Sequence, residues 1–216
     1  VEKADVLVEN FRPGVMDKLG LGFNSLKKIN NRLIYAAISG FGNPQFGKSP
    51  YLYWPSYDVV AQAMGGIIGI TGPDKNTPTK VGPGVGDIFS GLMMSFGIIS
   101  ALRMAEKTSK GQFIDLSMYD AVLSLCERII YQYDFDNSIP KPEGNGHPLL
   151  VPFGIYKSKD GHIALGIVDN SFWKILTNII GNKELVDNRK YETIESRQNN
   201  AKSLNSIIES WTRTKT

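Results

Sequence analysis

The sequence has little cysteine and little histidine: its 216 residues contain one cysteine, Cys126, and two histidines. A single cysteine excludes a disulfide framework within the chain and favours a reducing compartment. Because Cys126 lies in the apolar, periodic stretch 121–130, we expect it to be a buried core thiol. We therefore expect a cytoplasmic protein, or one of the mitochondrial matrix if its source is a eukaryote, and we expect no metal site.

Excess charge of one sign is also scarce. The chain has 24 Lys and Arg residues against 21 Asp and Glu residues, which gives a formal net charge of +3. No run of Lys and Arg concentrates this charge, so the sequence excludes the basic surface typical of nucleic-acid binding. A small polyanionic ligand remains compatible with it.

The sequence has no long uninterrupted hydrophobic run. Its longest apolar stretch, Ile88–Leu102, is broken by glycines and serines, which makes it short and weak for a membrane span. We therefore expect a buried helix there and no membrane partner. No basic segment followed by an apolar segment opens the chain, so nothing suggests secretion. The chain enters a strand-like segment directly after Val1 and stops after a helical pattern, so we expect both ends to be cut from a longer protein.

What is present is a pattern of apolar strands alternating with helices. Strands are expected at Asp5–Glu9 and Leu33–Ile38, with short helices at Val15–Leu19 and Ser25–Ile29 between them. This alternation predicts a parallel α/β sheet. Further along, the pattern predicts a helix from Tyr57 to Met64 with Ser56 as its N-cap, and then helices and a strand at residues 88–106, 113–116 and 118–134.

A polar connector rich in proline and glycine, residues 135–148, separates this region from a smaller α+β unit. Two strand-like runs, 153–157 and 162–166, are joined through the turn residues Asp160 and Gly161, and helices are expected at 171–180 and 195–211. The sequence thus predicts a partial Rossmann-like α/β domain over residues 1–134, a linker over 135–148, and part of a small α+β domain over 149–216.

Asp87 follows the glycine-rich loop 81–86 and precedes the expected helix from Ile88. One interpretation is an N-cap, in which the carboxylate accepts the first free backbone N–H groups of the helix. The other is a nucleophile, because glycines let a ligand approach closely and a carboxylate can attack an activated acyl group to give a mixed anhydride. Asn10 and Phe11 follow a strand end and Asp87 follows a glycine loop, so we expect the three residues to share one cleft.

Seven motif-like blocks follow one another along the sequence: Ala4–Gly14, Ser39–Gly42, Tyr57–Gly66, Gly86–Asp87, Lys107–Gln112, Asp115–Met118, and Gly146–Pro148 with Asp160–Gly161. Together they resemble family III CoA transferases, which include formyl-CoA transferase and carnitine CoA-transferase. Their order and their spread along the chain make the match specific, whereas any one block alone would be weak.

The resemblance implies an enzyme that moves coenzyme A from an acyl-CoA to a small carboxylic acid without a separate cofactor. Asp87 matches the family's catalytic aspartate, which forms an anhydride and then an aspartyl-CoA thioester. The resemblance places Asn10, Phe11, Arg12 and Lys18 at the CoA, and Tyr57 and Met118 nearer the thioester. It also implies an interlocked homodimer of the intact protein.

The sequence departs from some members of the family. Formyl-CoA transferase has a lysine where this chain has Ser39, and a glutamate where it has Asp58, which argues against specialised formyl transfer. The related α-methylacyl-CoA racemases pair the aspartate with a histidine, and that position is Tyr57 here. Transferase is therefore favoured over racemase. A non-catalytic relative is the third alternative, and the sequence names neither the donor nor the acceptor acid.

Overall fold

A computed structural model describes residues 1–182 and 184–216 and divides the chain into two compact units. The first unit comprises residues 1–71 and 75–142, and the second comprises residues 72–74 and 143–216. The boundary between Pro142 and Glu143 lies within the segment that we interpret as a linker. The roles of the two units as a CoA-binding domain and a small domain stay predictions.

The first unit is built on a parallel sheet whose strand order is β1 (Val6–Glu9), β2 (Ile34–Ser39) and β3 (Phe113–Ser117). Val8 of β1 is in register with Ala36 of β2, and Ser39 of β2 is in register with Ser117 of β3. The parallel pairing of the first two strands and the mixed α/β fold class are confirmed. Because the strands are parallel, their carboxyl ends all lie at one edge of the sheet.

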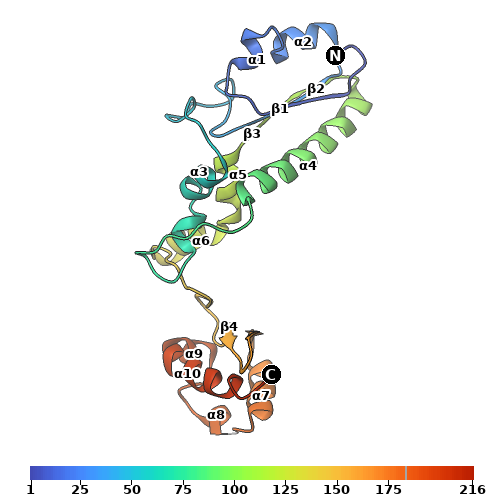
Figure 1. The fold of residues 1–216 in the computed structure, drawn as a ribbon. Helices are drawn as coiled ribbons and strands as arrows, with labels where there is room; N and C mark the ends of the chain where they lie inside the picture. The colour runs from blue at the N-terminus through green and yellow to red at the C-terminus, as the bar shows by residue number, and fades with distance from the viewer. Residues whose placement is uncertain (183) are drawn as a thin grey trace. The chain divides into compact units, whose positions relative to one another are not determined.

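Helices cover both faces of this sheet (Figure 1). On one face, α1 (Val15–Lys18) and α2 (Phe23–Ile29) enclose a cluster that includes Leu26 and Tyr35. On the other face, α4 (Val85–Thr108) buries Ala101 and Ala105 against Ile34 of β2. Side chains that follow one another along β2 thus enter opposite layers, which explains why this central strand is apolar throughout.

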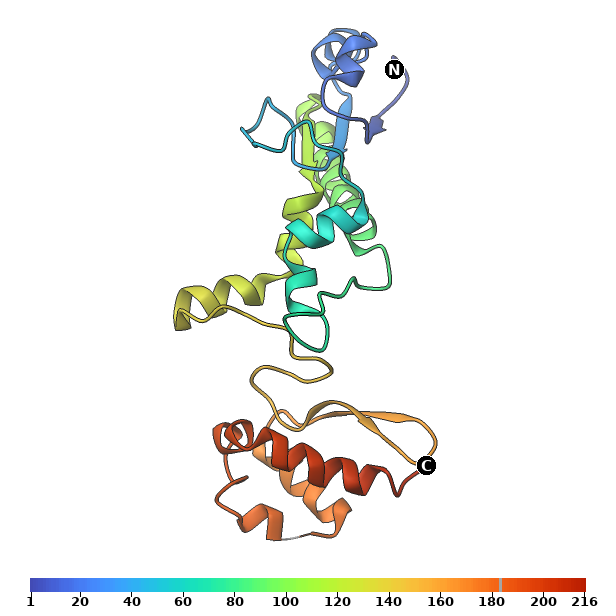
Figure 2. The same ribbon diagram turned by 60° about the vertical axis from the view of Figure 1, so that its left-hand side comes forward.

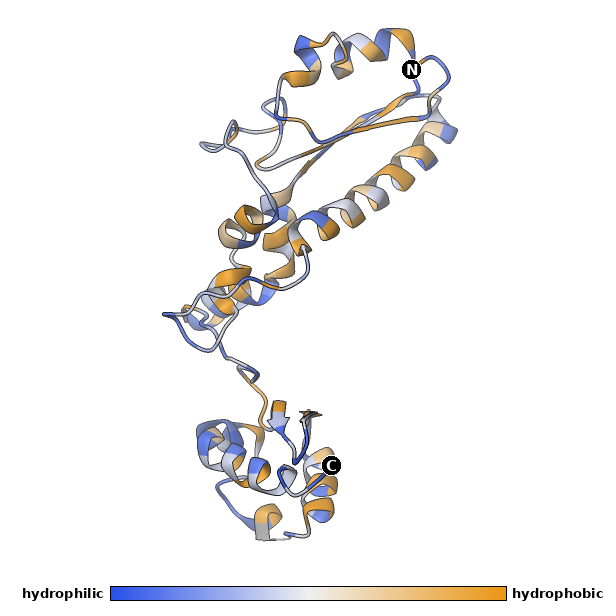
Figure 3. Ribbon diagram, in the orientation of Figure 1, coloured by the Kyte–Doolittle hydropathy of each residue, from blue (hydrophilic) through white to orange (hydrophobic). Residues whose placement is uncertain are grey.

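The outer side of α4 is exposed, so the expectation of a buried helix over residues 88–102 was wrong for this side. Leu92, Phe96 and Ile99 are 64%, 74% and 67% exposed, and Figure 3 shows hydrophobic residues recurring along the whole of α4. Apolar composition predicts burial only where another element covers the helix. By length and hydropathy α4 could also cross a membrane, but one such helix is weak support for a membrane segment.

The remaining helices of the first unit are α3 (Asp58–Met64), the 3₁₀ turn η1 (Ile67–Ile70), α5 (Met118–Leu125) and α6 (Glu127–Asp136). Figure 2 shows α3 and α5 side by side beyond the carboxyl end of the sheet. The single helix expected over 118–134 is broken at Cys126. The backbone N–H of Cys126 donates to the carbonyl oxygen of Leu123, three residues earlier, and this tighter turn ends α5. The Cys126 side chain is buried, as predicted.

The second unit packs helices on a hairpin of β4 (Phe153–Lys157) and β5 (His162–Gly166), which pair antiparallel as predicted. Its core contains Trp173 of α7 (Asn170–Ile180) and Leu204 and Ile208 of α10 (Ala201–Thr212). A further short helix, α8 (Glu184–Asp187), was not predicted from the sequence. The single helix expected over 195–211 is instead α9 (Ile194–Asn199) and α10, because Asn200 leaves the helical conformation between them.

Candidate active site

The carboxyl edge of the sheet brings together three segments that are far apart in the sequence. Asn10 and Phe11 follow β1, Gly40 follows β2, and Met118 follows β3. The amide N–H of Tyr119 donates to the carbonyl oxygen of Gly40 at 3.1 Å, and this bond fixes the ends of β2 and β3 relative to each other. The edge therefore offers side chains from three strands to one ligand.

A cavity of about 430 Å³ lies at this edge, and the start of α4 completes it. It brings together six of the seven residues that the sequence nominated, although they come from separate segments of the chain. The six are Asn10, Phe11, Arg12, Tyr57, Asp87 and Met118. The expectation that Asn10, Phe11 and Asp87 converge on one cleft thus agrees with the geometry, while their chemical roles stay predictions.

Asp87 is the third residue of α4, so the helix begins earlier than expected. Its N-cap position is Gly84, and the carboxylate that caps the helix is that of Asp58, whose Oδ1 accepts the backbone N–H of Gly86 at 2.8 Å. Ser56, expected to cap α3, does not do so, and Tyr57 holds that position without a side-chain hydrogen bond. The Asp87 carboxylate is exposed at the positive end of the helix dipole and is not needed as a cap.

Two apolar residues of the site differ in burial. The Phe11 ring is 54% exposed, so it is not a core residue and its face is available to a ligand. Met118 is only 9% exposed and packs with Ala61 and Val122, so it forms part of the core as well as the cavity floor. The site thus combines a fixed apolar wall at Met118 with accessible aromatic rings, of which Phe11 is one.

Lys18, the seventh nominated residue, does not line this cavity. It is the last residue of α1 and its side chain is exposed. Arg12 lines the cavity and is the cation that the structure brings to the site together with Asn10 and Phe11. A contact between Lys18 and CoA stays a prediction that this geometry does not support.

Several residues that line the cavity were not nominated from the sequence, among them Trp54 and Ser90. Trp54 is 58% exposed and belongs to the loop rich in glycine, proline and aromatics, which gave no signal beyond loop composition. Ser90 is buried, and its hydroxyl donates to the carbonyl oxygen of Gly86 one turn earlier. Its position about one turn after Asp87 places both on one helix face and could have identified it.

A second cavity of about 630 Å³ lies beside the first unit's sheet and has aromatic walls that include Phe41, Phe46 and Tyr119. Asp115 of β3 reaches into its lining. Burial raises the pKa of the Asp115 carboxyl, and the nearby charge of Asp120 raises this pKa further. The backbone N–H of Asn43, which donates to Oδ2 at 2.9 Å, acts in the opposite direction and lowers the pKa. Oδ1 of Asp115 is buried without a hydrogen-bond partner among the described residues.

Asp115→Asn is expected to raise the midpoint of thermal unfolding at about pH 7, because the asparagine still accepts from Asn43 and carries no charge to desolvate. A raised pKa in the folded state means that wild-type stability is greatest when the carboxyl is protonated and declines as pH rises through the raised pKa. The advantage of the variant should therefore vanish at about pH 3. Melting curves at the two pH values test this, and an equal difference at both would contradict it.

Within residues 1–182 and 184–216, no group of three or more His, Cys, Asp and Glu side chains is arranged to hold a metal ion. The lining of the first cavity offers the carboxylate of Asp87, the guanidinium of Arg12, and aromatic and apolar walls.

The chain is similar to curated CoA transferases along almost its whole length. A succinyl-CoA:mesaconate CoA-transferase of Haloarcula marismortui is 42% identical over 212 residues, which are 98% of this chain and 53% of that protein. An acetyl-CoA:oxalate CoA-transferase of Acetobacter aceti is 39% identical over 210 residues, 97% of this chain and 53% of that protein. The chain spans about half the length of the curated relatives it matches.

Solved structures give the same relationship. A CAIB/BAIF family protein from Brucella suis is 34% identical with a TM-score of 0.83, and the match covers 100% of this chain and 56% of that one. Rv3272 from M. tuberculosis is 26% identical with a TM-score of 0.85, over 100% of this chain and 55% of that one. The family model described as CoA-transferase family III matches residues 1–216. These matches confirm the resemblance found in the sequence, and the chain belongs to CoA-transferase family III.

Proposed function

We propose that this chain forms part of an enzyme that transfers coenzyme A from an acyl-CoA to a carboxylic acid, with Asp87 as the nucleophile. The observation that carries the proposal is the state of Asp87: its carboxylate is exposed in a cavity and Asp58 does the capping of α4. If Asp87 served only to cap α4, its carboxylate would be bound to the first backbone N–H groups of α4.

The proposed chemistry begins when the Asp87 carboxylate attacks the thioester carbonyl, forming a mixed anhydride and releasing the CoA thiolate. The thiolate then attacks the aspartyl carbonyl, which gives an aspartyl-CoA thioester and frees the donor acid. The acceptor carboxylate attacks this thioester to form a second anhydride, and the thiolate attacks its acyl carbon to release the new acyl-CoA. Asp87 returns as a carboxylate, so the enzyme consumes no cofactor.

The neighbours of Asp87 suit these steps. The start of α4 presents its positive dipole end to the oxyanions that develop on the thioester and anhydride carbonyls. The guanidinium of Arg12 suits a phosphate of CoA, since arginine binds phosphate oxygens in pairs. We assign Asn10 and Phe11 to contacts with CoA, and Tyr57 and Met118 to the thioester end of the cavity.

The racemase alternative requires a second acid/base group opposite Asp87. The described lining of the cavity contains Tyr57 but no histidine. Both histidines of the chain, His147 and His162, belong to the second unit. The absence of a histidine among these lining residues supports transfer over racemisation, because a racemase moves a proton to and from carbon and needs a base on each face.

For the intact protein we propose an interlocked homodimer, and the exposed apolar side of α4 supports a protein partner over this face. A cytoplasmic location stays a prediction.

The names of the two curated relatives suggest succinyl-CoA or acetyl-CoA as the donor and a dicarboxylic acid, mesaconate or oxalate, as the acceptor. We expect the full-length native polypeptide to convert succinyl-CoA and mesaconate or oxalate into succinate and the new acyl-CoA. Separation of the CoA thioesters by liquid chromatography with mass detection measures this directly.

The same reaction without an acceptor is the control, because hydrolysis would also consume succinyl-CoA. A 2-methylacyl-CoA incubated in D₂O tests the alternative chemistry. Deuterium at its α-carbon without transfer to any acid would favour a racemase, and no change in either thioester would favour a non-catalytic relative.

A further inference from the structure

The loop before α4 is tied to α3 by two side chains that are one helical turn apart. Asp58 is the first residue of α3, and its Oδ1 accepts the backbone N–H of Gly86 at 2.8 Å. Its other oxygen, Oδ2, accepts from the Nε2 amide of Gln62 at 2.8 Å. Asp58 therefore joins the start of α4 to a second side chain of α3, and both of its oxygens are used.

Gln62 carries the connection further into the loop. Its side chain is fully buried, and its Oε1 accepts the backbone N–H of Val81 at 3.0 Å. Its Nε2 also lies 3.4 Å from the carbonyl oxygen of Pro83. A buried amide whose oxygen and nitrogen both have partners stabilises one conformation of the loop, because any other would leave polar atoms buried and unpaired.

The approach of α4 to α3 leaves little room for a side chain at position 86. A Cβ added to Gly86 would lie 3.1 Å from the Ala61 Cβ and from the carbonyl oxygen of Asp58. Gly86 thus packs against α3, and the next residue in the chain is Asp87. A shift of the Gly86 backbone would move the Asp87 carboxylate with it.

We propose that Asp58 and Gln62, called here the α3 clamp, are positioning residues that set the place of Asp87 in the cavity. This role rests on the proposed function of Asp87. Neither residue needs to touch substrate: the clamp acts through Gly86, and α3 begins next to Tyr57, another residue of the cavity wall. A misplacement of about 1 Å can lower a rate by about 10²-fold, so the clamp should affect turnover more than binding.

The clamp can be tested by exchanging its two functional groups. In Asp58→Asn the amide oxygen still accepts from Gly86, but its NH₂ group faces the NH₂ group of Gln62. If the Gln62 amide rotated by 180°, its oxygen would accept from the new NH₂ group, but its own NH₂ group would then face the backbone N–H of Val81. In Gln62→Glu, two carboxylates face each other. The double variant D58N/Q62E restores every short bond, because the new amide would donate to one oxygen of the new carboxylate and the Val81 N–H to the other.

We expect each single variant to lower kcat by about 10- to 100-fold, with a smaller effect on KM. The double variant should regain most of the wild-type kcat. Amide hydrogen exchange of the peptide 79–90 should speed up in both single variants and slow again in the double variant. The matched control is Asp169→Asn, which alters an aspartate cap of α7 in the second unit and should leave kcat unchanged.

Loss of activity without faster exchange in the peptide 79–90 would overturn the positioning role, as would a double variant that regains protection but no activity. Failure of the proposed function has a different signature. In that case wild-type protein transfers no CoA, or Asp87→Asn retains full activity, whatever the exchange pattern of the loop.

Discussion

Asp87→Asn is expected to reduce CoA transfer by about 10³-fold or more, because an amide cannot form the anhydride through which both half-reactions pass. The free energy of unfolding should change by less than about 0.5 kcal/mol, since Asp87 is exposed and the capping carboxylate belongs to Asp58. Initial rates with succinyl-CoA, combined with urea denaturation of the same preparations, measure both quantities.

The matched control is Asp134→Asn, an exposed aspartate on α6 of the same unit, which should change neither quantity. If Asp87 had only a structural role, Asp87→Asn would be expected to keep its transfer activity. Asparagine is a good helix cap, so a cap at this position would leave transfer near the wild-type rate. Such a rate in Asp87→Asn would contradict the mechanism.

Arg197→Leu is expected to destabilise the second unit by about 3–5 kcal/mol, because it removes a buried cation that holds several acceptors. Arg197 is 1% exposed and donates to the carbonyl oxygens of Val151 and Tyr191 and to Oδ1 of Asn170. Its guanidinium also lies 5.3 Å from the centre of the Trp173 ring. Leucine would leave the carbonyl oxygens of Val151 and Tyr191, two buried residues, without this donor. Urea unfolding followed by tryptophan fluorescence reports the loss, since Trp173 is buried beside the substitution.

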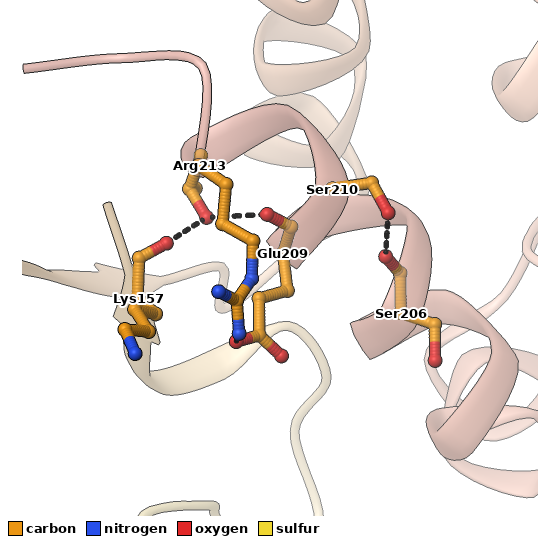
Figure 4. Close-up of polar contacts among 6 residues, drawn as sticks. Lys157, Ser206, Glu209, Ser210 and Arg213 are labelled. Atoms are coloured by element: carbon orange, nitrogen blue, oxygen red, sulfur yellow. Dashed lines mark hydrogen bonds and ion pairs between the residues drawn. The ribbon is translucent and has the colours of Figure 1, made fainter. Parts of the chain in front are cut away.

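Arg213→Leu is the control for this change. Arg213, directly after α10, pairs with Glu209 at 2.7 Å, and both side chains are about half exposed to solvent. Figure 4 shows the two side chains meeting at the end of α10. Exposed pairs of this spacing contribute about 0.3–0.5 kcal/mol. An equal decrease in the free energy of unfolding in the two variants would contradict the view that burial makes Arg197 important for stability.

The strands and the shared cavity could be predicted because local patterns determine them. The apolar run at Leu33–Ile38 is buried from both faces, so its continuous hydrophobicity was a reliable sign of a central strand. The convergence of Asn10 and Asp87 was expected because Asn10 follows a strand end and Asp87 follows a glycine-rich loop, and ligand sites of parallel sheets form beyond the carboxyl ends of the strands. Neither inference depended on a particular tertiary contact.

The features that were missed depend on contacts between distant residues. Asp58 caps a helix from 28 residues away, whereas a cap is recognised in sequence only when it directly precedes its own helix. The same rule wrongly nominated Ser56. The breaks at Cys126 and Asn200 were missed because helical periodicity continues across them. The exposure of α4 was missed because composition does not say which side of a helix is covered.

In the proposed mechanism the acyl and CoA groups pass through the Asp87 carboxylate, so the activated carboxylate should be trapped by a strong nucleophile. Full-length wild-type protein is incubated with succinyl-CoA and hydroxylamine, which attacks activated carboxyl groups, and the peptides are then analysed by mass spectrometry. We expect a hydroxamate on the peptide that contains Asp87, dependent on succinyl-CoA and absent from Asp87→Asn. An active enzyme that gives no adduct on this peptide, or gives one on another carboxylate, would contradict the proposed mechanism.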